Sequence, residues 1–148
     1  MYNEPLYIIL AEDDESDRLN FTEALAESKI RTTVRTVNDG VELMEYLSIE
    51  ENPLPDLLFL DLNLPRKNGL ECLKEIKTQQ RLKDISIAIY STSSTEADIE
   101  ETFRNGANVY IKKPNNFDLL KKSLNRVVRD AKEYQDPPFN RDFFLLRV

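Results

Sequence analysis

The sequence alternates short apolar runs with longer amphipathic stretches, and this alternation limits the fold more than any other feature. Five short runs are rich in apolar or β-branched residues, which is typical of β-strands. These predicted strands span residues 6–11, 31–37, 57–60, 85–90 and 109–111. The stretches that follow them have apolar residues at helical spacing and predict helices over residues 17–28, 41–48, 70–76, 93–105 and 117–131. The chain therefore repeats the order strand then helix five times.

Strands that alternate with helices favour a parallel sheet that is covered by helices on both faces. Five such units are too few for a closed eight-stranded barrel. The expected fold is an α/β protein of the (βα)5 type, with a doubly wound open sheet. In such sheets ligands bind at the carboxyl ends of the strands, so this edge is where functional residues are expected.

Length and composition are those of one globular domain. The chain has 148 residues, of which 41% are hydrophobic, and this supplies enough apolar material for a core. The formal net charge of −7 argues against binding to nucleic acids or to anionic membranes. The chain has no histidine, which excludes histidine-based catalysis and histidine metal sites. With three glycines, it has no Gly-rich dinucleotide or P-loop motif.

The chain also lacks the patterns of export and membrane insertion. Its apolar runs are far shorter than the roughly 18 residues of a membrane-spanning helix. The first residues lack the basic start of a signal peptide, and Cys72 is the one cysteine, so no internal disulfide can form. We therefore expect a cytoplasmic protein.

Polar residues stand at the carboxyl ends of four predicted strands. They are Glu12, Asp13 and Asp14 after the first strand, Asp61 after the third, Ser91 and Thr92 after the fourth, and Lys113 after the fifth. Two carboxylates 4 Å apart repel by about 4 kcal/mol at an effective dielectric constant of 20, so such a cluster needs a cation. Mg²⁺ prefers oxygen ligands and often accompanies phosphate groups. An aspartate beside Mg²⁺ and Lys113 suits nucleophilic attack on phosphorus.

Each of these residues also has an ordinary structural explanation. The acidic residues could simply begin a helix, since carboxylates are favourable at helix N-termini, and Asp14 is expected to cap one. Lys113 could be a solvated surface lysine, and Ser91 a turn hydroxyl. Tyr110 could be a packing residue of the fifth strand.

Four motifs in order favour the functional explanation. They are Leu10-Ala-Glu-Asp-Asp14, the segment 55–65 (PDLLFLDLNLP) with Asn68-Gly69, Ile89-Tyr-Ser-Thr92, and the segment 106–114 (GANVYIKKP). With these motifs the chain resembles the receiver domains of bacterial two-component response regulators, over residues 5–131. It is most similar to stand-alone receivers, of the chemotaxis type or paired with phytochrome kinases. The resemblance implies the flavodoxin-like strand order 2-1-3-4-5.

The resemblance implies a role for each residue of the acidic cluster. Asp61 matches the phospho-accepting aspartate, and Asp13 matches a direct metal ligand. Glu12 matches an acid that acts on the metal through water, and Asn63 matches the position whose backbone carbonyl binds the metal. Lys113 matches the lysine that contacts Asp61 and then the phosphoryl oxygens.

The resemblance also implies a switch. Ser91 matches the switch hydroxyl, although the neighbouring Thr92 offers a second hydroxyl. Tyr110 matches an aromatic residue that turns inward on activation. The bond between Lys113 and Pro114 is cis in the family.

The expected function is therefore a single-domain response regulator. A partner histidine kinase, for which the phytochrome type is one candidate, would transfer a phosphoryl group to Asp61 in a reaction that needs Mg²⁺. A downstream protein would then recognise the changed surface. The protein would not be an enzyme in the usual sense. One alternative is a Mg²⁺-dependent phosphatase, but its signature has a second aspartate where this chain has Asn63. Another is a degenerate receiver that only binds partners.

Residues 132–148 are expected to form a C-terminal extension. Its end, the segment 143–146 (FFLL), is too apolar to remain solvated. We expect it to dock on its own domain or on a second copy in a homodimer.

Overall fold

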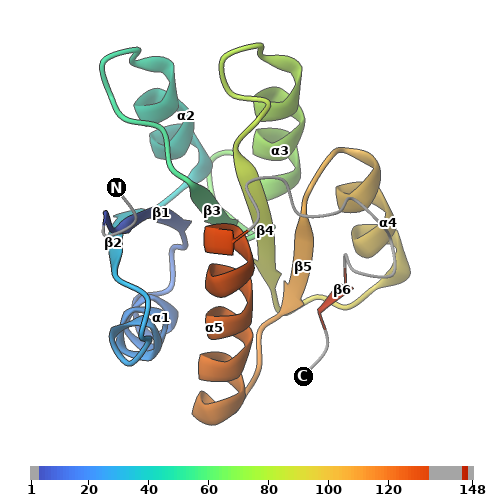
Figure 1. The fold of residues 1–148 in the computed structure, drawn as a ribbon. Coiled ribbons are helices and arrows are strands. Elements are labelled where there is room, and N and C mark those ends of the chain that lie inside the picture. The colour runs from blue at the N-terminus through green and yellow to red at the C-terminus, as the bar shows by residue number, and fades with distance from the viewer. Residues whose placement is uncertain (1–3, 134–144, 147–148) are drawn as a thin grey trace.

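Among the residues that the computed structural model describes, 4–133 and 145–146, six parallel strands form one central sheet (Figure 1). The strands are β1 (Leu6–Ala11), β2 (Thr32–Val37), β3 (Leu57–Leu60), β4 (Ser86–Ser91), β5 (Val109–Lys112) and β6 (Leu145–Leu146). Their spatial order is β2-β1-β3-β4-β5-β6, and each neighbouring pair is parallel. The predicted order of the first five strands is confirmed.

Helices cover both faces of this sheet. They are α1 (Glu15–Ala26), α2 (Gly40–Ser48), α3 (Gly69–Thr78), α4 (Glu96–Arg104) and α5 (Phe117–Glu133). One apolar core lies between the sheet and α2, α3 and α4, and a second lies between the sheet and α1 and α5 (Figure 1). Every residue of β3 is buried because helices cover both faces of the sheet there. In β2, at the edge of the sheet, exposed residues are interspersed with partly buried ones.

Local capping fixes where the helices begin. Asp14 caps α1, since its Oδ1 accepts a hydrogen bond of 2.8 Å from the backbone N–H of Asp17. The predicted start of the fourth helix at residue 93 is wrong. Thr95 caps α4 instead, by accepting from the N–H of Asp98 at 3.2 Å, and Ser93 donates its hydroxyl to the Asp98 carboxylate at 2.5 Å. The helix begins at Glu96 because Thr95, and not a residue before position 93, provides the N-cap.

Two glycines shape the ends of helices, Gly69 at the carboxyl edge of the sheet and Gly106 at the opposite edge. A Cβ on Gly69 would overlap the backbone oxygen of Asp61, so the start of α3 can approach the end of β3 only with glycine there. Gly106 follows α4 with a φ of 96°, as expected for a helix C-terminus. The first contact holds the start of α3 against the residue that follows β3.

The peptide bond between Lys113 and Pro114 differs from the expectation. Within residues 4–133 and 145–146 no peptide bond is cis, so this bond is trans. Cis and trans differ by only about 0.5–1 kcal/mol before proline, so the local sequence does not choose between them.

The C-terminal part of the chain returns to the sheet. The backbones of Leu145 and Leu146 pair with Tyr110 and Ile111 of β5 in the same chain. Residues 134–144 and 147–148 lie outside the described part, and they include Phe143 and Phe144 of the apolar segment. The docking partner of the whole extension therefore stays a prediction.

None of the helices in the described ranges, 4–133 and 145–146, combines the length and the apolar character needed to span a membrane.

Candidate functional site

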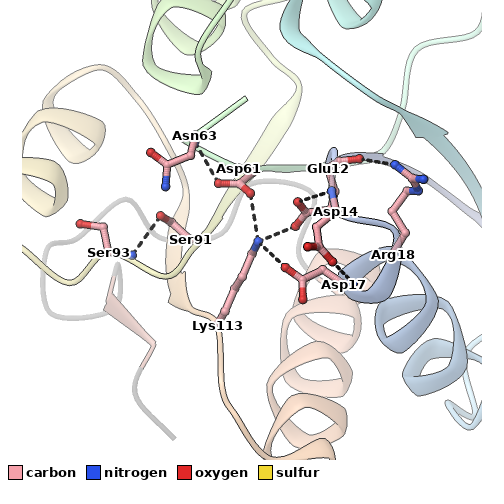
Figure 2. A network of polar contacts seen from close by, with 9 residues as sticks. All are labelled: Glu12, Asp14, Asp17, Arg18, Asp61, Asn63, Ser91, Ser93 and Lys113. Carbon is pink, nitrogen blue, oxygen red and sulfur yellow. Dashed lines mark hydrogen bonds and ion pairs between the residues drawn. The ribbon is translucent and has the colours of Figure 1, made fainter. Parts of the chain in front are cut away.

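The ammonium group of Lys113 is the centre of a polar network at the carboxyl edge of the sheet (Figure 2). Its Nζ lies 2.5 Å from Oε1 of Glu12, 2.9 Å from Oδ2 of Asp61 and 3.0 Å from Oδ2 of Asp17. Glu12 directly follows β1, Asp61 follows β3 and Lys113 follows β5. Three strand ends therefore bring acidic and basic side chains together, as their positions in the sequence predict.

Of the three charged side chains at the strand ends, Glu12 and Asp61 are buried and Lys113 is largely covered. The exposed fractions are 1% for Glu12, 6% for Asp61 and 9% for Lys113. Buried charges are tolerated when they are paired and hydrogen-bonded. The second oxygen of Asp61 accepts a hydrogen bond of 2.9 Å from the backbone N–H of Asn63. Both oxygens of this carboxylate are thus held in place.

Burial and crowding perturb the protonation of this network. Desolvation raises the pKa of Glu12 to about 7; the negative charge of Asp61 adds to this effect, and the hydrogen bond from Lys113 opposes it. Burial acts to lower the pKa of Lys113, but its hydrogen bonds to the three carboxylates outweigh burial and raise it. Lys113 therefore stays charged, while Glu12 is the group whose charge changes near neutral pH.

Three acids are arranged so that they can hold a metal ion. Oxygen atoms of Glu12, Asp13 and Asp61 all lie within 4.8 Å of one another. Hard divalent cations prefer such carboxylate oxygens. This donor set fits a divalent cation, and the cation would offset the repulsion that the single ammonium of Lys113 leaves unbalanced.

The predicted switch residues lie beside this network. Ser91, at the end of β4, is fully buried, and its Oγ accepts a hydrogen bond of 3.2 Å from the N–H of Ser93. Thr92 is exposed. Tyr110 is fully buried and donates its hydroxyl to the backbone oxygen of Ser93 at 2.9 Å. The ring of Tyr110 is inward in this structure. Whether it changes position on phosphorylation is not shown by one state, so its role as a switch stays a prediction.

Comparison with known proteins identifies the family. The response regulator receiver domain family matches residues 8–125 of the sequence. The chain belongs to this family. The receiver is 37% identical to response regulator Rcp1 of Synechocystis over 124 residues, which cover 80% of this chain and 84% of Rcp1.

Solved receiver structures share the fold. The phosphorylated cyanobacterial phytochrome response regulator RcpA is 39% identical, with a TM-score of 0.80 over 86% of this chain and 94% of RcpA. The Mn²⁺-bound form of Rcp1 is 34% identical, with a TM-score of 0.79 over 88% of this chain and 96% of Rcp1. The protein is thus a receiver response regulator that a kinase phosphorylates, a signalling switch and not a conventional enzyme.

Two residues of this receiver's network, Asp17 and Arg18, are not predicted by the sequence motifs. Asp17 lies in the first turn of α1 and pairs with Lys113 at 3.0 Å. Its position one turn after the cap at Asp14 was a usable signal, because this spacing points the side chain back toward the end of β1. Arg18 was also missed; its Nη1 donates to the backbone oxygen of Glu12 at 2.9 Å.

Proposed function

We propose that Asp61 is the residue that accepts the phosphoryl group. In this reaction the N–P bond of a kinase phosphohistidine breaks, and a bond forms between phosphorus and a carboxylate oxygen of Asp61. The observation that carries the proposal is the position of the Asp61 carboxylate, which is fixed by Lys113 on one oxygen and by the N–H of Asn63 on the other. Phosphoryl transfer needs mainly such positioning and charge neutralisation.

Mg²⁺ is the cation that this proposal assigns to the acidic cluster. Asp13, Asp61 and the backbone carbonyl of Asn63 would hold it directly, and Glu12 would hold it through water. The clustering of the carboxylate oxygens within 4.8 Å supports this assignment, as does the Mn²⁺ found in crystals of Rcp1. Bound there, the cation supplies positive charge to the phosphoryl oxygens.

Lys113 and Ser91 would then recognise the phosphoryl group. Lys113 would donate a hydrogen bond to one phosphoryl oxygen, and Ser91 would donate its hydroxyl to another. The movement of Ser91 shifts the loop at Ser93, whose backbone oxygen receives the hydroxyl of Tyr110. The surface of α4 and β5 changes as a result, and a downstream protein reads it. Phosphorylation is thus a shift between two populations.

A single-residue comparison tests the acceptor. Wild-type protein is incubated with phosphoramidate and Mg²⁺ and analysed by intact mass. We expect one added phosphoryl group on the wild type, none on Asp61→Asn, and one on the control Asp56→Asn, which removes an exposed acid at the opposite end of β3. A phosphoryl adduct on Asp61→Asn, or equal labelling with the metal chelated, would contradict the proposal.

A second comparison separates the two candidate hydroxyls. Because Ser91 is fully buried and Thr92 is exposed, Ser91→Ala should weaken the response of the loop to phosphorylation and Thr92→Ala should not. Changes in NMR shifts of the backbone between residues 91 and 95 on phosphorylation would report this. The reverse pattern would assign the switch to Thr92.

The proposed phosphoryl donor is a histidine kinase of the phytochrome type. RcpA, at 39% identity, is a cyanobacterial phytochrome response regulator, which supports this class of partner. Radiolabelled phosphoryl groups should pass from a phytochrome-type kinase to this receiver faster than from an unrelated kinase. Equal rates would argue against the assignment.

A further inference from the structure

The third ion pair of Lys113 has no part in the function proposed above. It joins Nζ to the carboxylate of Asp17, at 3.0 Å. Asp17 comes from α1, whereas the other two partners of Lys113 follow strands (Figure 2). The position of the Asp17 backbone is fixed because its N–H is bonded to the capping carboxylate of Asp14.

This third pair uses up the hydrogen-bonding capacity of the ammonium group. A lysine ammonium has three N–H donors and no acceptor. In the described structure, carboxylate oxygens of Glu12, Asp17 and Asp61 all lie within hydrogen-bond distance of Nζ. A phosphoryl oxygen can therefore bind Lys113 only by displacing one of these carboxylates.

The three carboxylates differ in how easily they can release Lys113. Glu12 is 1% exposed and Asp61 is 6% exposed, whereas Asp17 is 37% exposed. A carboxylate that can reach water loses little when it gives up an ion pair, but a buried one is left unpaired at high cost. Asp17 is therefore the partner that can leave.

Asp17 also stands apart from the metal-binding group. Among the described residues, the acids whose oxygens gather closely enough to share a cation are Glu12, Asp13 and Asp61. No cation at that position would neutralise Asp17 directly. Its charge instead remains next to the place where phosphorylation adds negative charge.

We propose that Asp17 is a positioning residue that restrains Lys113 in the resting receiver and thereby opposes phosphoryl binding at Asp61. The inference rests on the proposed function, because it assumes that Asp61 is the acceptor. Asp17 competes with the phosphoryl oxygens for the same ammonium group, and it repels them. Its position in the first turn of α1 thus sets how readily the receiver takes up a phosphoryl group.

The test measures affinity for fluoroberyllate, a non-reactive mimic of the phosphoryl group, by calorimetry in the presence of Mg²⁺. Asp17→Asn keeps the shape of the side chain and removes its charge. We expect it to bind fluoroberyllate about three- to tenfold more tightly than the wild type, a range set by partial solvent screening. Its rate of labelling by phosphoramidate should rise by a similar factor.

Two variants distinguish the effect of the contact between Asp17 and Lys113 from the general effect of removing a negative charge. Glu15→Gln removes the same charge from the same turn of α1, at an exposed residue, and should stay within about twofold of the wild type. Asp17→Glu restores the carboxylate and should also return to within about twofold. Melting temperatures of all variants show whether folding is intact.

Several outcomes would overturn the inference. They are unchanged or weaker fluoroberyllate binding by Asp17→Asn, an equal gain in Glu15→Gln, or loss of Mg²⁺ binding in Asp17→Asn, which would make Asp17 a metal ligand. Failure of the wild type itself to bind fluoroberyllate or to be labelled at Asp61 would instead refute the proposed function. The two failures are therefore distinguishable.

Discussion

At the scale of single residues, Lys113 holds the charge balance of the site. Its ammonium contacts Glu12, Asp17 and Asp61, and it also lies 5.2 Å from the ring centre of Tyr90. A buried pair that loses one partner leaves an uncompensated charge. Lys113 is thus a structural residue of the resting state as well as a candidate ligand of the phosphoryl group.

Replacing Lys113 by methionine should lower the free energy of unfolding by about 3–5 kcal/mol in the absence of metal, because Glu12 and Asp61 lose their cation. Urea denaturation at neutral pH measures this change. The adjacent exposed Lys112 provides the matched control, and Lys112→Met should shift the value by less than about 0.5 kcal/mol. Equal stabilities of the two variants would contradict the role of Lys113.

Glu12 should make the stability of the metal-free protein depend on pH. Its pKa is raised from 4.5 to about 7 on folding, so between these values the native state binds more protons than the unfolded state. The free energy of unfolding therefore falls as pH rises through this window, by up to about 3 kcal/mol, and the stabilisation is fully present below pH 4.5. Glu12→Gln should flatten this part of the curve. Parallel curves for the two proteins would refute the assignment.

At the scale of elements, the junction of β3 and α3 determines where Asp61 lies. Three contacts hold this junction: the N–H of Gly69 donates to the backbone oxygen of Leu62 at 3.0 Å, Asn68 caps α3, and Asn63 holds the Asp61 side chain. The close approach of Gly69 to the Asp61 backbone leaves no room for a side chain.

Gly69→Ala should therefore push the start of α3 away from Asp61. We expect a loss of about 1–3 kcal/mol in the free energy of unfolding, as for other overpacked sites, together with slower labelling by phosphoramidate. Thr78→Ala at the far end of α3 is the control and should leave the labelling rate unchanged. Normal labelling of a destabilised Gly69→Ala variant would show that the junction serves folding alone.

At the scale of the whole molecule, the C-terminal strand extends the sheet beyond the five strands of the predicted fold. β6 pairs with the outer edge of β5, next to Tyr110. An uncovered edge strand presents unpaired backbone groups, so pairing here protects β5. A second copy of the chain would pair with this edge of β5 only by replacing the chain's own β6, and the homodimer remains a prediction.

Truncation after Gln135 tests the extension. We expect the melting temperature to fall by about 2–4 °C because β5 loses a backbone partner. Light scattering of the same samples shows whether the extension links two copies. If it does, the mass falls from that of two chains to that of one chain on truncation. An unchanged mass together with an unchanged melting temperature would show that the extension contributes neither docking nor dimerisation.

The sequence alone determined the five strands, their helices and the residues at the strand ends. The periodicity of apolar residues can be recognised within each segment, and the carboxyl ends of parallel strands must lie at one edge of the sheet. Glu12, Asp61 and Lys113 could therefore be brought together without coordinates. The N-cap at Asp14 could also be predicted from the sequence, because a capping side chain bonds to a backbone N–H only three residues further along the chain.

Only the tertiary structure decided the contacts that depend on how elements pack. Asp17 reaches Lys113, 96 residues away, because Phe21 and Leu25, one and two turns further along the same side of α1, pack in the core and so set the rotation of the helix about its axis. The inward position of Tyr110 and the pairing of β6 likewise depend on distant backbone. A local pattern can indicate where such a side chain points, as for Asp17, but not which distant residue it meets, since the free energy of the contact arises only when separate segments have already met.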